Sequence, residues 1–255
     1  MQEAEARWHE GLASEEEFWH RWIATAGDQW PDDFARRLQR RPLEPIETEC
    51  LRRSPGDTAT MIDVGAGPLT VLGTDHPTKS VEIVAVDPLA DRYDELLAAA
   101  NIEPPVRTQL CAGEKLLERF GPDSFDVAHA RNAPDHTYDP IAVINNMLAV
   151  VRPGGFVILH HWVNEGERES YAGLHQWNLD ARRGRFVIWR PGERRRDVAR
   201  GLTVQAHVWV RKRDEWLVCV LQRAPRQASV ATRLRQPLRD ASFGRFLNRT
   251  LRPTS

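Results

Sequence analysis

The stretch Met61-Ile62-Asp63-Val64-Gly65-Ala66-Gly67-Pro68 joins an apolar strand pattern to two glycines that are one residue apart. Because glycine has no side chain, a Gly-x-Gly turn after a buried strand lets a ligand approach the backbone closely. A second apolar run, residues 81–86, leads into the carboxylate of Asp87, about twenty residues after the glycines. An acid at this distance lies where a nucleotide ribose would present its hydroxyl groups. The two strands together predict a nucleotide-binding turn in an α/β sheet.

The composition is that of an ordinary globular chain and excludes several classes of protein. Of the 255 residues, 41% are hydrophobic and 28% are charged, and the formal net charge is -1. A net charge this close to zero does not indicate a nucleic acid or a membrane surface as the partner of the whole chain. No apolar run approaches the ~20 residues of a membrane helix, and the acidic start of the chain is unlike a secretory signal. The three cysteines, Cys50, Cys111 and Cys219, form no Cys-x-x-Cys pair, so we expect reduced thiols in a cytoplasmic protein.

Residues 1–57 are predicted to form an N-terminal helical cap. The stretch Ser14-Glu15-Glu16-Glu17 has the spacing of a capping box and predicts a helix start, and Trp30-Pro31 interrupts that helix. One face of the helix is apolar and carries Phe18, Trp19, Trp22 and Ile23. The helix either packs on the sheet as a cap or serves as a lid whose aromatic side chains line a substrate pocket.

Residues 58–223 are predicted to form the core, because apolar strand patterns alternate with helical ones. Strands are expected at 60–64, 81–87, 106–111, 125–130 and 155–161, and helices at 88–100, 114–120 and 139–151, with a short helical turn at 68–73. The runs 202–210 and 215–221 then predict an antiparallel hairpin. We therefore expect an α/β fold with a Rossmann-like, mostly parallel sheet of about seven strands that ends in an antiparallel hairpin.

Two further segments interrupt or follow this pattern. Residues 162–200 form an insertion after strand five, with an extra strand pattern at 185–189, and long insertions at this edge tend to face substrate. Residues 224–255 form a basic tail with one acid, Asp240, and seven arginines, namely 226, 233, 235, 239, 245, 249 and 252. The tail is either a solvated basic helix or docking tail, or a surface for RNA or another polyanion.

Several motifs together resemble the class I S-adenosylmethionine-dependent methyltransferases. The stretch Asp63-Val64-Gly65-Ala66-Gly67 matches the first motif of that family, and Asp87 matches its ribose-binding acid. Phe125–Asn132 resembles the fourth strand, and Val151-Arg152-Pro153-Gly154-Gly155-Phe156-Val157 resembles the entry into the fifth. The closing hairpin is also typical of the family. The resemblance spans about 58–222 and implies methyl transfer, with S-adenosylmethionine as the cofactor.

The resemblance also implies which residues hold the cofactor. They are Asp63, Gly65, Ala66, Gly67, Pro68, Asp87, Pro88, Ala112, Gly113, Glu114, Arg131 and Asn132. Two positions depart from the family pattern: Leu69 stands where a third small residue is usual, and Ala112 stands where an adenine-binding Asp is common. Backbone groups of Ala112 and Gly113, or the side chain of Glu114, would then replace that Asp.

Candidate catalytic residues follow the fourth and fifth strands, where parallel strands present their carboxyl ends to a ligand. Histidine suits general-base chemistry because its pKa lies near neutrality, and we rank His161 first, His136 second and His160 third. Strand alternation places His160 and His161 on opposite faces, so at most one of them can face the pocket. Four residues are candidates for substrate binding, namely Asp135, Trp162, His175 and Trp177. No ligand spacing predicts a metal site, although Asp135, His136 and His161 could form one.

We expect O-methylation of a sugar or another hydroxylated small molecule. Methylation of RNA or protein is an alternative suggested by the basic tail. An NAD(P)-binding oxidoreductase and a cofactor-binding protein without catalysis are further alternatives. A small-molecule acceptor is the expected partner, a membrane is not, and a homodimer is left open.

Overall fold

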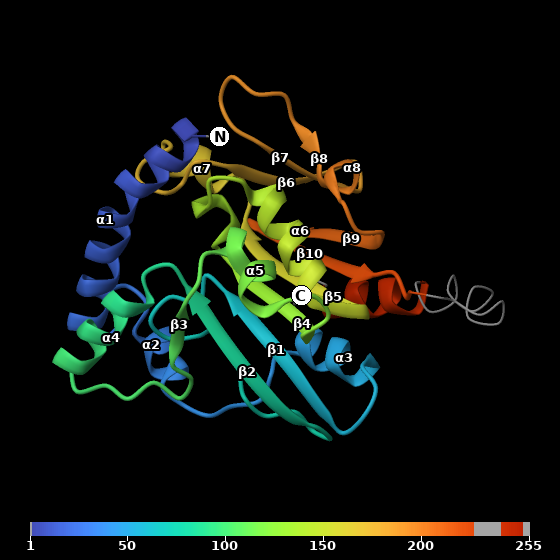
Figure 1. Ribbon diagram of the computed structural model, residues 1–255, viewed down its shortest axis with the longest axis horizontal. Helices are drawn as coiled ribbons and strands as arrows, with labels where there is room; N and C mark the ends of the chain where they lie inside the picture. Colours follow the sequence, from blue (N-terminus) through green and yellow to red (C-terminus); the bar gives the residue numbers. More distant parts are fainter. Residues whose placement is uncertain (1, 227–240, 252–255) are drawn as a thin grey trace.

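The computed structural model describes residues 2–226 and 241–251 and arranges them around a seven-stranded sheet (Figure 1). The strands lie in the order β3-β2-β1-β4-β5-β10-β9. Pairing is parallel from β3 to β5, whereas β10 pairs antiparallel with both β5 and β9. The bounds are β1 (Thr58–Val64), β2 (Ser80–Asp87), β3 (Thr108–Leu110), β4 (Phe125–Arg131), β5 (Val151–Trp162), β9 (Ala206–Arg213) and β10 (Trp216–Arg223). The predicted mostly parallel sheet with a closing hairpin is confirmed.

Helices cover both faces of this sheet. Helix α6 (Pro140–Val150), with α5 (Leu116–Phe120) beside it, covers one face, and α3 (Pro45–Arg53) covers the other together with a helix over 241–250. Strand alternation divides the side chains between the faces: Ala128 and Ala130 pack on the α6 face, and Val127 packs on the α3 face. Helix α4 (Ala90–Ala99) connects β2 to β3.

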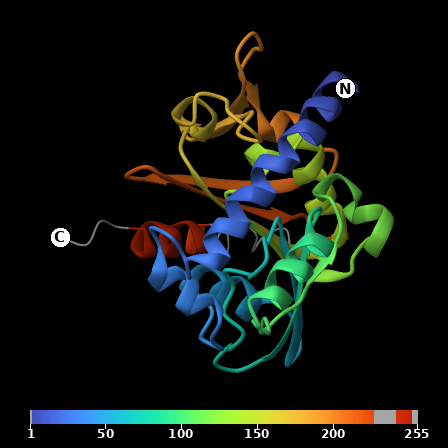
Figure 2. The same cartoon turned by 90° about the vertical axis from the view of Figure 1, so that its left-hand side faces the viewer.

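Helix α1 (Gln2–Ala24) lies across the end of the molecule toward which the arrows of β1 and β2 point (Figures 1 and 2). The prediction that this helix starts at Ser14 is wrong. Ser14 lies within the helix, and its hydroxyl donates to the carbonyl of Gly11 instead of capping a terminus. The break at Trp30-Pro31 is confirmed, because α2 (Pro31–Arg37) begins at the proline, a favourable first position.

The segment that follows β1 holds no helix, so the helical turn predicted at 68–73 is wrong. Arginine side chains replace the missing helical hydrogen bonds: Arg37 donates to the carbonyl of Leu69, and Arg41 donates to the carbonyl of Val71. The side chain of Leu69 is 1% exposed and packs against α1 and α2. The irregular path is therefore held by the N-terminal helices.

Helix α3 was not predicted. It begins with Pro45 at its first turn and buries Ile46, Cys50 and Leu51 against the sheet. The proline and the apolar residues four and five positions apart are the signals that could have identified it. The segment after β1 contributes no helix to this face of the sheet, and α3 packs there instead.

The insertion after β5 forms a second, three-stranded antiparallel sheet. Its elements are α7 (Glu165–Arg168), β6 (Asn178–Arg182), β7 (Arg185–Trp189), β8 (Arg196–Asp197) and α8 (Val198–Gly201). The strand expected at 185–189 is confirmed. Its side chains Phe186 and Ile188 join the core on the α6 face, so the insertion is packed and not a free loop.

Part of the basic tail is structural. In the helix over 241–250, Phe243 and Leu247 are each 1% exposed and pack on the α3 face of the sheet. Four of the tail arginines, at positions 233, 235, 239 and 252, lie outside the described residues. Within residues 2–226 and 241–251, no helix combines the length and apolar character needed to cross a membrane.

Candidate active site

A cavity of about 920 Å³ lies at the carboxyl ends of β1, β2, β4 and β5. Its floor includes the glycine turn after β1, and its roof is formed by α1 and α2. The roof contributes aromatic and aliphatic side chains, namely Trp8, Leu12, Phe18, Trp19, Trp22 and Trp30. Of the two roles considered for the N-terminal helix, the structure therefore favours a wall of the pocket.

The two glycines of the turn adopt backbone conformations that other residues avoid. Gly65 has φ +70° and Gly67 has φ +65°, both in the left-handed region. A Cβ at Gly65 would lie 2.3 Å from the Cβ of Ala133, and one at Gly67 would lie 2.7 Å from the indole of Trp19. Both conformation and space thus require glycine, and the turn exposes backbone to the cavity.

Asp87 is fixed at the cavity wall by backbone donors. Its Oδ2 accepts from the N–H of Gly67 at 3.1 Å, and its Oδ1 accepts from the N–H of Leu89 at 2.9 Å. Burial raises the pKa of Asp87 to about 6, although these hydrogen bonds oppose the rise. The carboxylate therefore sits in a prepared position beside the glycine turn.

Asp63 supports the turn from below. Its Oδ2 accepts from the hydroxyl of Thr70 at 2.5 Å, and its Oδ1 lies 2.7 Å from Nδ1 of His129. Asp63 is 1% exposed, so this pairing takes place inside the protein. The first acid of the motif therefore connects the turn to β4.

Glu114 lies on the far side of the cavity, in the short 3-10 helix η1 (Gly113–Lys115). Its Oε1 accepts from the backbone N–H groups of Tyr138 at 3.2 Å and Asp139 at 3.4 Å. Burial raises the pKa of Glu114 to about 7. Ala112 and Gly113, which the family resemblance implies as cofactor residues, line the same wall of the cavity.

Three histidines from distant parts of the chain surround Asp135, which lies in the 3-10 helix η2 (Pro134–His136). The Oδ1 of Asp135 lies 2.7 Å from Nε2 of His161, and its Oδ2 lies 2.8 Å from Nδ1 of His175. The Nε2 of His136 is 3.0 Å from the same Nδ1 of His175. Asp135, His136 and His175 have ligand atoms within 4.8 Å of one another, yet each oxygen of Asp135 already has a histidine partner.

Burial and neighbouring charges shift the pKa of Asp135 and of its histidine partners in opposite directions. Burial alone would raise the pKa of Asp135, but the charges of His136 and His161 and the histidine hydrogen bonds hold it below its ordinary value. Burial disfavours charge on His175, but the hydrogen bond and the charge of Asp135 raise its pKa to about 9. The pKa of His161 is raised in the same way, against burial, by Asp135.

The structure brings together some predicted catalytic residues and separates others. His136 and His175 line the cavity, whereas His161 is fully buried and does not line it. The Nδ1 of His161 faces the carbonyl of Trp162 at 2.7 Å, so both of its ring nitrogens face acceptors. Strand alternation places His160 on the face of β5 opposite to His161, the face on which Ile158 packs. Burial lowers the pKa of His160 to about 3.

Among the predicted cofactor residues, only Pro68 does not line the cavity. Asn132 has φ +47°, and its Oδ1 accepts from the N–H of Trp162 at 3.0 Å, which joins the ends of β4 and β5. Trp162 lines the cavity, whereas Trp177 is buried and donates from Nε1 to the carbonyl of Thr137 at 2.9 Å. Asp135 lies behind the wall, under His175.

Sequence reasoning missed several cavity residues, among them Arg37, Glu165, Arg168 and Trp216. Arg37 comes from α2 and Trp216 from the start of β10, so no local motif joins them to the glycine turn. Glu165 could have been found, because it follows His161 by four residues in the insertion predicted to face substrate.

Comparison with known proteins agrees with this geometry. Residues 62–159 match the family model described as a methyltransferase domain. An uncharacterized methyltransferase from Schizosaccharomyces pombe is 27% identical over 107 residues, which make up 39% of this chain and 38% of that relative. The chain thus matches well under half the length of this curated relative.

Solved methyltransferase structures were also found to be similar. One of them is a 1,6-didemethyltoxoflavin-N1-methyltransferase from Burkholderia thailandensis, solved with bound 1,6-didemethyltoxoflavin and S-adenosylhomocysteine. It is 18% identical to this chain and has a TM-score of 0.47, and the alignment covers 85% of this chain and 90% of that chain. An O-methyltransferase family protein from the same organism is 13% identical, with 88% and 63% covered and a TM-score of 0.47.

The family match covers the glycine turn, Asp87 and the strands that form the cavity floor. The sheet that contains it closes with the antiparallel hairpin typical of these enzymes and not of NAD(P)-binding oxidoreductases. Residues 62–159 therefore form a methyltransferase domain similar to those of the class I S-adenosylmethionine-dependent methyltransferases, and the match supports S-adenosylmethionine as the cofactor.

Proposed function

We propose that the whole protein methylates a hydroxyl oxygen of a sugar or another hydroxylated small molecule. The observation that carries the proposal is a cavity lined both by the glycine turn and by His175, which Asp135 holds from behind. A cofactor site and a candidate base therefore open into the same space. The roof formed by α1 favours a small acceptor over a macromolecule.

The residues at the turn fit S-adenosylmethionine. A Cβ at Gly65 or Gly67 would collide with Ala133 or Trp19, so the narrow turn beside the cavity requires glycine. The carboxylate of Asp87 is held where it can accept from ribose hydroxyls. We assign to the same site Asp63, Ala66, Pro68, Pro88, Ala112, Gly113, Glu114, Arg131 and Asn132. When bound, the cofactor supplies a methyl group on a positively charged sulfur.

The cavity has room for a small acceptor beside the cofactor. Its volume of about 920 Å³ is at the upper end of the ~300–1,000 Å³ usual for small-molecule sites. One wall carries the stacked rings of Trp162 and Trp216, whose centroids are 4.3 Å apart. The guanidinium of Arg168 lies 4.8 Å from the Trp162 ring. Such a wall suits a flat or ring-shaped acceptor.

We assign the general base to His175 instead of His161. With Nδ1 held by Asp135, the Nε2 of His175 has no hydrogen-bond partner among the described residues and can accept the hydroxyl proton. With its proton on His175, the acceptor oxygen would be free to take the methyl group that the cofactor would supply. His136, at 3.0 Å from His175, helps to orient the ring.

The cofactor assignment is tested by calorimetry with S-adenosylmethionine and with NAD. We expect binding of S-adenosylmethionine only, and at least a ~10-fold loss of affinity in Gly67→Ala, because the new Cβ would meet Trp19. Gly154→Ala is the matched control, since Gly154 also has a positive φ, +88°, but no atom of residues 2–226 and 241–251 lies within 4 Å of a Cβ placed there. Equal affinities in both variants would refute the assignment of the turn.

The catalytic assignment is tested by a mass-shift screen of hydroxylated acceptors, followed by kinetics of His175→Asn. Removal of a general base should lower kcat by about 10²–10⁴-fold while S-adenosylmethionine still binds. His20→Asn, an exposed histidine on α1, is the control and should keep full activity. Cofactor binding without methyl transfer to any acceptor would favour the non-catalytic alternative.

A further inference from the structure

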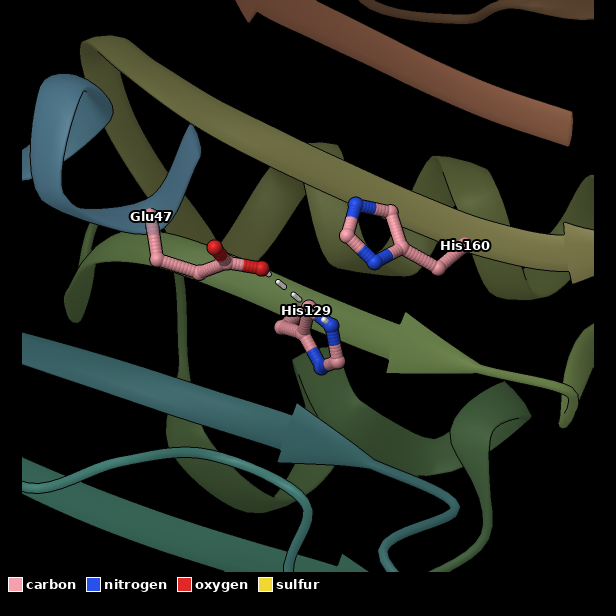
Figure 3. Close-up of side chains that lie close together, drawn as sticks. All are labelled: Glu47, His129 and His160. Carbon is pink, nitrogen blue, oxygen red and sulfur yellow. Dashed lines mark ion pairs between the residues drawn. The ribbon is translucent and has the colours of Figure 1, made fainter. Parts of the chain in front are cut away.

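A second cluster of ionisable side chains lies on the α3 face of the sheet, apart from the lining of the cavity. Glu47 comes from α3, His129 from β4 and His160 from β5, and the three side chains point toward one another (Figure 3). Each offers one ligand atom, and these atoms all lie within 4.8 Å of one another. Glu47 is 2% exposed and His129 is 1% exposed, whereas His160 is partly exposed, so most of the cluster lies inside the protein.

Two polar atoms in this cluster are buried without a hydrogen-bond partner in the part of the chain that the structure describes, namely Oε2 of Glu47 and Nε2 of His160. The other oxygen of Glu47 is 3.7 Å from Nε2 of His129, which is beyond hydrogen-bond distance. A carboxylate oxygen and an imidazole nitrogen without hydrogen-bond partners are costly to bury in a protein interior. Some further group is needed to satisfy them.

His129 is arranged as a metal ligand. Its Nδ1 is 2.7 Å from Oδ1 of Asp63, and this pairing leaves Nε2 directed at Glu47. A carboxylate on one ring nitrogen fixes the orientation of the ring and makes the other nitrogen a better ligand. By contrast, both oxygens of Asp135 in the cavity cluster already have a histidine partner.

We propose that Glu47, His129 and His160 bind one zinc ion. Two imidazole nitrogens and one carboxylate oxygen are a donor set that Zn²⁺ accepts in tetrahedral sites, with a fourth position left for water. Ligand atoms about 2.1 Å from zinc lie roughly 3.4 Å apart, so rotation of the Glu47 side chain must draw the set together by about 1 Å. Asp63 and Glu47 offset the charge of the ion.

The ion would act as a clamp and not as part of methyl transfer. None of the three ligands lines the cavity. Zinc would join α3 to β4 and β5, and Asp63 would connect it to the glycine turn through Thr70. The segment after β1 forms no helix, so it provides no neighbouring helix that could hold α3 on the sheet. A zinc ion would supply a contact that such a helix could otherwise make.

The test is metal analysis of the purified full-length chain. After dialysis against a chelator and reloading with zinc, we expect one zinc per chain, lost in His160→Gln and kept in His175→Asn. Zinc at a hundredfold excess over its Kd should raise the Tm of the wild type by roughly 5 °C or more. His160→Cys should restore zinc binding, because a thiolate is also a zinc ligand.

A cobalt-loaded sample gives a second measurement that does not depend on stability. Tetrahedral Co²⁺ should give visible absorption in the wild type and none in His160→Gln, whose S-adenosylmethionine binding reports whether it has folded. Zinc retained in His160→Gln but lost in His175→Asn would overturn the proposal in favour of the cavity histidines. No zinc in the wild type would also overturn it and leave a plain network of Asp63, His129 and Glu47.

Discussion

At the scale of single residues, Asp135 decides what its neighbours can do. It is fully buried and hydrogen bonded to two histidines, so its charge is compensated by His161 on one side and His175 on the other. His161 is enclosed between Asp135 and a backbone carbonyl, whereas His175 reaches the cavity. Two histidines that share one carboxylate therefore have different tasks, because only one of them can meet a substrate.

This pairing predicts the pH dependence of catalysis. A base must be neutral to accept a proton, and the pKa of His175 is raised to about 9. The value of kcat/KM should therefore rise about tenfold per pH unit up to about pH 9 and then level off. In Asp135→Asn the carboxylate that raises the pKa is lost, so the plateau should begin at lower pH, with a lower maximum because the ring is less well oriented.

Steady-state kinetics from pH 6 to 10 on both proteins would measure this shift. His20→Asn should reproduce the wild-type profile, because His20 is exposed on α1. A wild-type profile that is flat over this range, or one that Asp135→Asn leaves in place, would rule out His175 as the base.

At the scale of elements, the segment between β1 and β2 differs most from the predicted pattern. It has no helix of its own, and arginines from the chain before it bond its backbone carbonyls. Arg41 has a side chain that is 15% exposed, and burial lowers its pKa. The segment and the N-terminal helices therefore depend on each other for their hydrogen bonds.

We predict that Arg41→Met lowers the free energy of unfolding by about 1–3 kcal/mol, since the carbonyl of Val71 loses its donor. The neighbouring Arg40 pairs with Asp75 through a side chain that is 77% exposed, so Arg40→Met should change stability by less than ~1 kcal/mol. Urea denaturation of both variants makes the comparison. Equal losses would mean that Arg41 contributes no more than a surface charge.

At the scale of the whole molecule, the first helix and the last described helix are both built into the fold. Helix α1 forms the roof of the cavity, and the helix over 241–250 packs Phe243 against Phe156 and Trp209. Removal of residues 226–255 would therefore expose core side chains, so this deletion is a poor test of nucleic-acid binding. Substitution of the exposed Arg245 and Arg249 by Gln tests the charge without disturbing the core.

We expect Phe243→Ala to cost about 3–5 kcal/mol of unfolding free energy, as is typical for a buried aromatic residue. Phe246→Ala, a partly buried neighbour on the same helix, should cost clearly less. Thermal or urea unfolding measures both. A loss below ~1 kcal/mol at Phe243 would show that the C-terminal helix does not stabilise the core in solution.

Most of the sheet could be predicted from the sequence, because strand alternation and the Gly-x-Gly turn are local patterns. The start of α1 could not, since the capping signal at Ser14 lies inside a longer helix. The turn predicted at 68–73 failed because bonds from Arg37 and Arg41 and the burial of Leu69 replaced helix formation. In both places tertiary contacts outweighed local propensity.

By itself the sequence determined the methyltransferase domain, since the glycine turn, Asp87 and the closing hairpin are patterns of residue type and spacing. Only the tertiary structure decided which histidine reaches the cavity, and which buried histidines meet Asp63, Glu47 and Asp135. The physical reason is that a strand fixes the face on which a side chain lies, but its neighbours come from segments far apart in the chain. The distances between these side chains and their burial determine their charge states and therefore their function, and a local sequence pattern contains no information about either.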